Sequence, residues 1–175
     1  GTSEQSMTAF LETYETFDHE KVEPIYIRPA IIAVQKGNPK NIRSFDDLLA
    51  KGIKIVVTEG KGTYNTSGTG VWEDLAGRKG SLNDIARFRD NIVAYSLGSG
   101  ASFKAFKDEK ADAWITWPNW PLNNSKDMDM VSIDKDRAIW RDLNIVVSPK
   151  ADPQTKDFLN FLITKKGQKI MKTEG

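Results

Sequence analysis

The stretch from Lys54 to Asp74 reads Lys-Ile-Val-Val-Thr-Glu-Gly-Lys-Gly-Thr-Tyr-Asn-Thr-Ser-Gly-Thr-Gly-Val-Trp-Glu-Asp. Its β-branched run, Ile55–Val57, is typical of a buried parallel strand. A loop of glycine, threonine, serine and asparagine follows. Val71, Trp72 and Leu75 are then spaced to cover one face of a helix. The stretch therefore predicts a strand, a loop and a helix in succession, which is the repeating unit of an α/β fold.

The start of this predicted helix is a candidate anion-binding site. The first N–H groups of a helix lack partners within the helix, and the helix dipole favours negative charge there. The hydroxyl groups of Thr66, Ser67 and Thr69 can supply further donors. An ordinary connection with Ser67 or Thr69 as the helix N-cap explains the same residues equally well. Nucleotide-binding loops do not fit, because Ser67 and Asn65 stand where those motifs require glycine.

The same succession recurs further along the chain. Ile92–Tyr95 predicts a strand, Ser96–Ala101 a loop rich in glycine and serine, and a helix with Phe103 and Phe106 turned inward follows. Ligands of open α/β sheets bind beyond the carboxyl ends of the strands, so the two loops are expected to converge on one cleft. This repetition favours an anion-binding site over two ordinary connections.

A third strand is predicted at Ala111–Trp117, ending in a loop bounded by two prolines. Three tryptophans lie within seven residues, and such side chains serve in cores, interfaces and binding sites. Trp114 is expected in the core. Trp117, Asn119 and Trp120 follow at the end of the strand and are candidates for the wall of a cleft.

Composition narrows the possible functions. The 25 basic and 24 acidic residues nearly cancel, which argues against nucleic acid as a partner. No apolar run approaches the roughly 18 residues that a membrane span requires. Cysteine is absent and His19 is the single histidine, so thiol chemistry, a zinc site and a Ser-His-Asp triad are not expected. We expect no catalytic residues, metal or cofactor, and hence a binding protein rather than an enzyme.

The remaining segments suggest how the chain is divided. Val22–Val34 reads as one long strand broken at Arg28–Pro29, which indicates either a crossing between two lobes or an edge strand. Ile145–Val147 predicts the last strand. Helices are expected at both ends, with Gly167 dividing the last from a short tail helix. We predict an α/β lobe with a mainly parallel sheet over residues 31–146, crossing strands at 24–30 and 147–148, and a second body in which residues 1–23 pack with residues 149–175.

Several short motifs occur in a specific order along nearly the whole chain: Thr2-Ser-Glu4, Val22-Glu-Pro-Ile-Tyr-Ile-Arg-Pro-Ala30, Gly37-Asn-Pro39, Gly70-Val-Trp-Glu-Asp74, Ala76-Gly-Arg-Lys-Gly80 and Asp112-Ala-Trp-Ile115. In this order they resemble the accessory colonization factor proteins called AcfC, which are relatives of the sulfate- and molybdate-binding periplasmic receptors. The tail from Phe158 to Ile170 is similar to the closing helices of many type II solute-binding proteins.

The resemblance implies a type II periplasmic-binding-protein fold, in which two α/β lobes joined by crossing strands close on a small oxyanion or carboxylate. It also implies export to the periplasm, and a membrane permease of an ABC transporter or a chemotaxis receptor as partner, without direct membrane insertion. The residues that it places in the ligand site are Thr2 and Ser3 on the first lobe, and Ser67, Gly68, Thr69, Gly70, Ser99, Gly100, Ala101, Trp117 and Asn119 on the second.

Two further expectations follow from the resemblance. The family carries roughly half a lobe before the point that matches Gly1, so the first lobe is expected to be incomplete in this chain and to expose apolar surface at Phe10, Phe158 and Phe161. The effector-binding domain of a LysR-type regulator shares this lobe architecture and is the alternative function. A signal peptide upstream would favour the first reading, and a helix-turn-helix the second.

Overall fold

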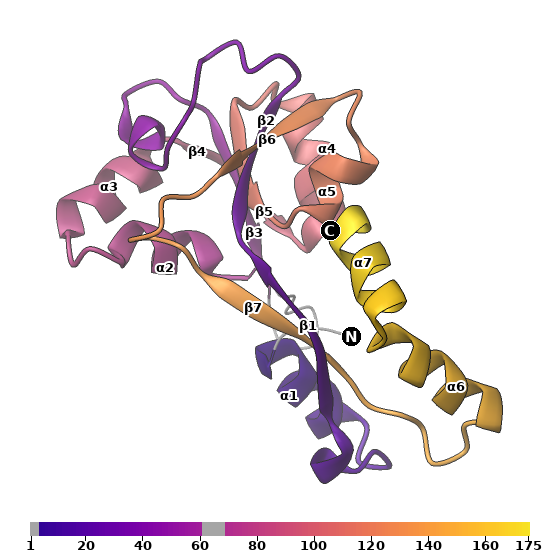
Figure 1. Ribbon diagram of the computed structural model, residues 1–175. Helices are drawn as coiled ribbons and strands as arrows, with labels where there is room; N and C mark the ends of the chain where they lie inside the picture. The colour runs from indigo at the N-terminus through magenta and orange to yellow at the C-terminus, as the bar shows by residue number, and fades with distance from the viewer. Residues whose placement is uncertain (1–3, 61–68) are drawn as a thin grey trace.

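The computed structural model describes residues 4–60 and 69–175, and their strands form two sheets. A five-stranded sheet has the order β4-β3-β5-β2-β6, and a two-stranded ribbon joins β1 to β7 (Figure 1). The strands are β1 (Glu23–Pro29), β2 (Ile31–Gln35), β3 (Ile55–Glu59), β4 (Ile92–Leu97), β5 (Ala113–Thr116), β6 (Met128–Ser132) and β7 (Trp140–Ile145).

The helices of the described residues lie on both sides of the five-stranded sheet and along the ribbon. In Figure 1, α2 and α3 lie on one side of the sheet and α4 and α5 on the other, while α1, α6 and α7 accompany the ribbon. Their bounds are α1 (Glu4–Thr13), η1 (His19–Lys21), η2 (Asp46–Leu49), α2 (Val71–Gly77), α3 (Leu82–Asp90), α4 (Ser99–Asp108), α5 (Asn119–Asn123), α6 (Pro153–Leu162) and α7 (Lys165–Glu174).

Four strands of the five-stranded sheet run in one direction, and β2 alone runs against them. Strand β3 is parallel to β4 and to β5, but β2 is antiparallel to both of its neighbours, β5 and β6. The reason lies in the chain path. Strand β2 follows β1 directly and enters the sheet from the ribbon, so it runs opposite to the strands that are reached through helices.

Alternation along the strands builds a core on each face of this sheet. In β2, Ile32 and Val34 pack with the cluster that contains Phe45, which precedes η2, and Trp72, Leu75 and Phe88 from α2 and α3. Ile31 and Ala33 face the other way, toward the cluster of Phe106, Trp114 and Met128. Successive side chains of a strand point to opposite faces, so a short run of apolar residues serves both cores. Trp114 is fully buried, as the sequence predicted.

Arg137 joins the helices on the α2 side of the sheet. Its side chain is 1% exposed, and Nη1 donates to the carbonyl oxygens of Leu75 and Ala76 at the end of α2, both at 3.1 Å. Its Nη2 lies 3.2 Å from Asp46 Oδ1 in η2 and 2.5 Å from Asp84 Oδ2 in α3. One buried guanidinium therefore fixes the relative positions of three helices.

The ribbon is the connection between the five-stranded sheet and the two ends of the chain. Pro29 pairs with Trp140, and the Ala30 N–H donates to the Ile139 carbonyl at 2.8 Å, so the chain enters and leaves the sheet region at adjacent points. The strand predicted at Ile145–Val147 lies upstream of that position, at Trp140–Ile145, and residues 147–148 follow it. Backbone pairing with β1 extends through polar residues such as Arg141 and Asp142, which an apolar pattern does not reveal.

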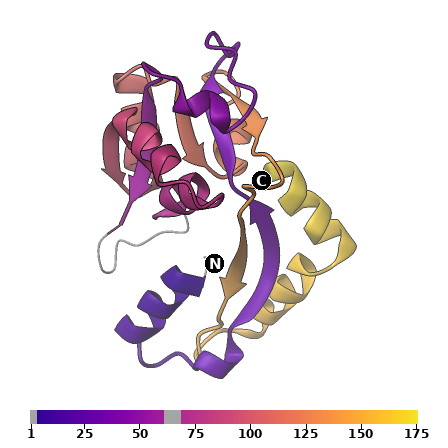
Figure 2. The ribbon, with the colours of Figure 1, turned by 90° about the vertical axis from the view of Figure 1, so that its left-hand side faces the viewer.

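The terminal helices meet the ribbon from opposite sides. Figure 2 shows α1 on one side of β1 and β7, with α6 and α7 on the other. The Gln168 side chain of α7 donates to the Ile25 carbonyl of β1 at 2.8 Å. The two segments predicted to pack on one another are therefore separated by the ribbon. The prediction of exposed apolar surface agrees with α6, where Phe158 is 58% and Phe161 is 37% exposed, whereas Phe10 is half-buried.

The junction between α6 and α7 differs from its predicted form and carries a first testable prediction. Gly167 lies inside α7, and Thr164 caps that helix through a hydrogen bond from the Gly167 N–H at 3.1 Å. A Cβ added at Gly167 would stand 2.2 Å from the Phe161 carbonyl oxygen and 2.7 Å from that of Leu162. Because these are backbone atoms, a Gly167→Ala substitution is expected to lower the free energy of unfolding by at least about 1–3 kcal/mol. Chemical denaturation measures this, and Gly100→Ala, whose Cβ meets nothing within 4 Å, is the matched control that should show no such loss.

Candidate functional site

Three parallel strands end at one edge of the five-stranded sheet. Strands β3, β4 and β5 share a direction, so the segments that follow Glu59, Leu97 and Thr116 all leave from this carboxyl edge. The Gly98 N–H donates to the Glu59 carbonyl at 3.0 Å and joins two of these segments directly. Strand β2 begins at the same edge, since Ile31 pairs with Thr116. The topology thus gathers at one place the connections that the sequence singled out.

The helix after β4 presents its first turn at this edge. Helix α4 begins at Ser99 behind Gly98, which has φ +79° and offers no side chain to cap the helix. Ser99 is half-buried, whereas Gly100 and Ala101 are exposed. The Ser102 N–H is the first to bond back, to the Gly98 carbonyl at 3.1 Å. The backbone N–H groups of Ser99, Gly100 and Ala101 are therefore the helix donors that an anion can use.

A buried hydrogen-bond network supports this first turn from behind. Ser102 Oγ and Thr58 Oγ1 are 2.7 Å apart, and Ser102 Oγ also donates to the Gly98 carbonyl at 3.0 Å. The Trp114 indole donates to Thr58 Oγ1 at 3.2 Å. These three side chains tie β3, β5 and α4 together in the core. The position of the α4 N-terminus is consequently fixed by the sheet and not by the loop that precedes it.

Trp117 and Asn119 stand where β5 ends. Trp117 is only 2% exposed, and within residues 4–60 and 69–175 its Nε1–H has no hydrogen-bond partner. Such a buried donor costs free energy unless something accepts from it. The Asn119 side chain accepts a hydrogen bond from Arg28 Nη1 at 3.1 Å. Trp120, also a candidate for the cleft wall, instead packs on Trp114 and Phe103, with ring centroids 5.2 and 5.4 Å away.

Arg28 is the site residue that the sequence analysis did not select. It lies in β1, its guanidinium carbon is 5.0 Å from the Trp117 ring centroid, and Nη1 also lies 3.5 Å from the Gly175 backbone oxygen. Burial lowers the pKa of Arg28 to about 10. The available signal was its position as the one basic residue in the largely apolar Val22–Val34 run.

The other predicted ligand residues fall at or beyond the limits of the described chain. Thr2, Ser3, Ser67 and Gly68 lie outside the described residues. Thr69 and Gly70 are half-buried and precede α2. Gly70, with φ +71°, is the N-cap residue of this helix. The alternative of an ordinary loop had placed Ser67 or Thr69 at that position. The structure therefore brings together Ser99, Gly100, Ala101, Trp117 and Asn119 at one edge, with Arg28 added to them.

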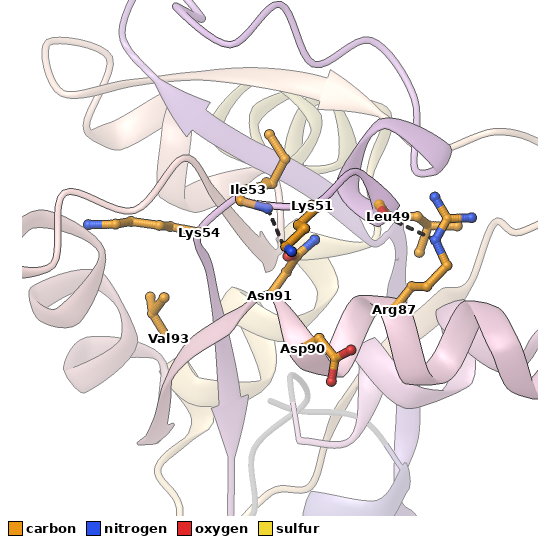
Figure 3. Close-up of a pocket in the computed structure, with 9 residues that line it drawn as sticks. Leu49, Lys51, Ile53, Lys54, Arg87, Asp90, Asn91 and Val93 are labelled. Atoms are coloured by element: carbon orange, nitrogen blue, oxygen red, sulfur yellow. Dashed lines mark hydrogen bonds between the residues drawn. The ribbon is translucent and has the colours of Figure 1, made fainter.

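A separate hollow of about 720 Å³ lies at the opposite edge of the sheet (Figure 3). Lys51, Lys54 and Arg87 line it, and the Arg87 Nε donates to the Leu49 carbonyl at 3.2 Å. Asn91, which also lines the hollow, donates hydrogen bonds to the carbonyl groups of Leu48 and Ala50. This hollow adjoins the amino ends of β3 and β4, away from the predicted site.

Across residues 4–60 and 69–175, no three His, Cys, Asp or Glu side chains are grouped so as to hold a metal ion. In the same part of the chain, no helix combines the length and apolar character needed to cross a membrane.

Comparison with known proteins identifies the class. The model of the bacterial extracellular solute-binding protein family matches residues 2–175, and the chain belongs to this family. Its fold is that of the type II periplasmic binding proteins. The protein is thus a solute-binding protein of an extracellular or periplasmic family.

Individual proteins of known structure or function resemble this chain to different degrees. The chain is 42% identical to PEB3 in its L-phospholactate complex, with a TM-score of 0.91, over 99% of this chain and 75% of that chain. PEB3 from Campylobacter jejuni gives 42% identity and a TM-score of 0.90. The sulfate-binding protein SubI from Mycobacterium tuberculosis H37Rv, at 18% identity and a TM-score of 0.71 over 99% of this chain and 66% of SubI, shares the fold. The Escherichia coli (strain K12) sulfate-binding protein is 26% identical over 156 residues, which are 82% of this chain and 44% of that protein. The chain thus spans less than half the length of the curated relatives it matches.

Proposed function

We propose that this chain belongs to a periplasmic binding protein that captures a small oxyanion or carboxylate in a cleft between two lobes. The observation that carries the proposal is the buried Trp117 N–H, which has no acceptor among the described residues, at the same sheet edge as the first turn of α4. Neutral N–H donors suit an anion, because they compensate its charge without a second full charge.

The ligand class follows from the relatives as a proposal. PEB3 was crystallised with L-phospholactate, and the sulfate-binding proteins are named for an inorganic oxyanion. Both are small, negatively charged and rich in acceptor oxygens, as the donors at the carboxyl edge require. We also propose that, within this family, the chain is related to the accessory colonization factor proteins. We propose no enzymatic activity for this site.

The proposed partner is either the permease of an ABC transporter or a chemotaxis receptor. The closed protein would deliver its ligand to the permease, or report the bound ligand to the receptor. The LysR-type effector domain is the alternative from a different class. Membership of an extracellular solute-binding family supports the first of these.

A ligand screen tests the proposal. Thermal unfolding of the full-length protein is measured with sulfate, phosphate, molybdate, L-lactate and L-phospholactate, each against sodium chloride of equal ionic strength. A ligand that binds only the folded state stabilises it by RT ln(1 + [L]/Kd), so the melting temperature should rise with concentration for at least one anion. A flat response to all five probes would contradict the proposed function.

A further inference from the structure

Strand β4 is one of the two outer strands of the five-stranded sheet, and it exposes a row of apolar side chains. Val93, Tyr95 and Leu97 are 43%, 47% and 59% exposed, and they alternate with the more buried Ala94 and Ser96. The outer edge of a sheet invites pairing with another strand, and charged side chains on the edge strand usually discourage it. No residue of β4 is charged, so this edge lacks that protection.

The other outer strand, β6, differs in this respect. It carries Asp129, whose carboxylate accepts hydrogen bonds from Lys36 Nζ at 2.6 Å and from the Gly37 N–H at 2.7 Å. Met130 is its exposed large apolar side chain, at 45%. A charged pair on an edge strand works against the approach of a further strand. The two edges of one sheet are therefore unequal, and β4 is the one suited to a partner.

The backbone of β4 presents hydrogen-bonding groups at Tyr95 and Leu97. The Gly98 N–H points toward β3, where it donates to the Glu59 carbonyl at 3.0 Å. The N–H and C=O groups of successive strand residues point to opposite edges. Ser96 therefore faces β3 as Gly98 does, and the backbone groups of Tyr95 and Leu97 point away from the sheet. An antiparallel strand can form a hydrogen-bonded pair with Tyr95.

The spacing of the apolar side chains is self-complementary. When β4 pairs antiparallel with a second β4 and Tyr95 lies opposite its own counterpart, Val93 lies opposite Leu97 and Leu97 opposite Val93. All three exposed apolar residues then form cross-strand pairs on one face, which is the contact that stabilises paired strands. Residues that contact each other reciprocally in this way define a two-fold interface.

The charges at the two ends of β4 favour the same arrangement. Val93 lines the hollow of Figure 3, which is lined by one carboxylate, Asp90, and by three basic side chains, Lys51, Lys54 and Arg87. At the other end, Leu97 pairs with the exposed Glu59 of β3. An antiparallel second copy brings the basic end of each chain toward the acidic end of the other, whereas a parallel one would bring like ends together.

We propose that β4 is the interface of a symmetric dimer of this chain, in which it pairs antiparallel with β4 of a second copy and Tyr95 lies at the two-fold axis. Leu97 of the second copy then lies opposite Val93, at the hollow of about 720 Å³. A standard interface buries about 1,600 Å², and strand pairing supplies only part of this area, so the dimer is expected to dissociate on dilution. This inference goes beyond the proposed function, because it requires no ligand.

Sedimentation velocity of the full-length protein over a range of concentrations tests the proposal. The wild type should form a dimer at high concentration. Tyr95→Lys places two ammonium groups opposite each other at the axis, so it should weaken dimerisation on the order of 100-fold. Leu97→Lys, which leaves the contact of Tyr95 with Trp72 in place, should also weaken it. Met130→Lys makes the same kind of change on β6 and should leave dimerisation unchanged.

Mixing two variants tests the position of the axis. Tyr95→Glu should be monomeric for the same reason as Tyr95→Lys. An equimolar mixture of the two should form dimers, because a carboxylate then lies opposite an ammonium group. Two Tyr95 variants that remain monomeric when mixed would overturn the self-pairing of Tyr95.

Other results also overturn the proposal. A wild type that stays monomeric at every concentration contradicts it, as does a dimer that folded Tyr95→Lys and Leu97→Lys variants leave intact. Equal weakening by Met130→Lys and Tyr95→Lys would show that β4 is not the interface. Melting temperatures of the variants establish that each is folded.

Discussion

Replacing Arg137 with methionine is expected to lower the free energy of unfolding by about 3 kcal/mol. The substitution removes the cation from Asp84 and the donors from two carbonyl groups of α2. Breaking a buried pair by removing one partner costs roughly 3–5 kcal/mol. The lower end applies, since the Asp84 side chain is 17% exposed and water can reach it. Denaturant unfolding measures the loss, and Arg141→Met, which breaks an exposed pair with Asp74, should cost less than about 1 kcal/mol.

The same variant has a signature in its pH dependence. Hydrogen bonding from Arg137 holds the pKa of Asp84 below its usual value of 3.8. A lowered pKa in the folded state contributes stability that is present above the unfolded pKa and is lost as pH falls through the folded pKa. The stability difference between wild type and Arg137→Met should therefore narrow as pH falls below about 4. A difference that stays constant from neutral to strongly acidic pH would assign the whole effect to packing and to the carbonyl hydrogen bonds.

Replacing Gly100 with proline is expected to reduce ligand affinity by about two decades. Proline removes the Gly100 N–H from the first turn of α4, and a hydrogen bond to a charged group contributes about 1.5–3 kcal/mol. It also restricts Ser99, the preceding residue. The loss should exceed that of Ser99→Ala, which removes a hydroxyl and keeps every backbone donor.

Gly100→Ala separates the donor from the added volume. A Cβ at this position meets nothing within 4 Å, so the alanine variant should bind nearly as tightly as wild type. Calorimetric titration with the anion found in the ligand screen makes the comparison. Similar losses in the alanine and proline variants would mean that the backbone N–H of Gly100 does not contact the ligand.

Local signals in the sequence were sufficient for much of the fold. The apolar run at Ile55 became β3. Ser81 and Asp152, residue types that commonly cap helices, begin α3 and α6 and accept hydrogen bonds from the backbone N–H groups of Asp84 and Thr155. Ser44 and Asp47 also exchange hydrogen bonds of the capping-box kind, yet only the single 3₁₀ turn η2, with Phe45 at its N-cap, follows Ser44. That turn ends at Leu49, so a local cap pattern marks where a helical turn begins but does not determine its length.

Features that depend on contacts between distant segments were harder to predict. The direction of β2 and the upstream extent of β7 follow from pairing with β1, which no local pattern encodes. In the sequence, Arg28 was visible only as part of the Arg28–Pro29 break in a strand. Its contacts with Trp117 and Asn119 join residues about 90 positions apart, which local patterns do not reveal. That the segments after β3, β4 and β5 leave from one edge follows from strand direction alone.

The β1–β7 ribbon also bears on how the protein folds. Its paired residues, such as Pro29 and Trp140, are more than 100 residues apart in the sequence. Bringing such distant segments together costs more chain entropy than forming the local strand and helix units between them. Once the five-stranded sheet has formed, Ala30 and Ile139 are already neighbours, and the remaining loop-closure cost is small. We therefore expect the sheet region to acquire hydrogen-exchange protection before the ribbon does, and the ribbon with its helices to be the first part to open on unfolding.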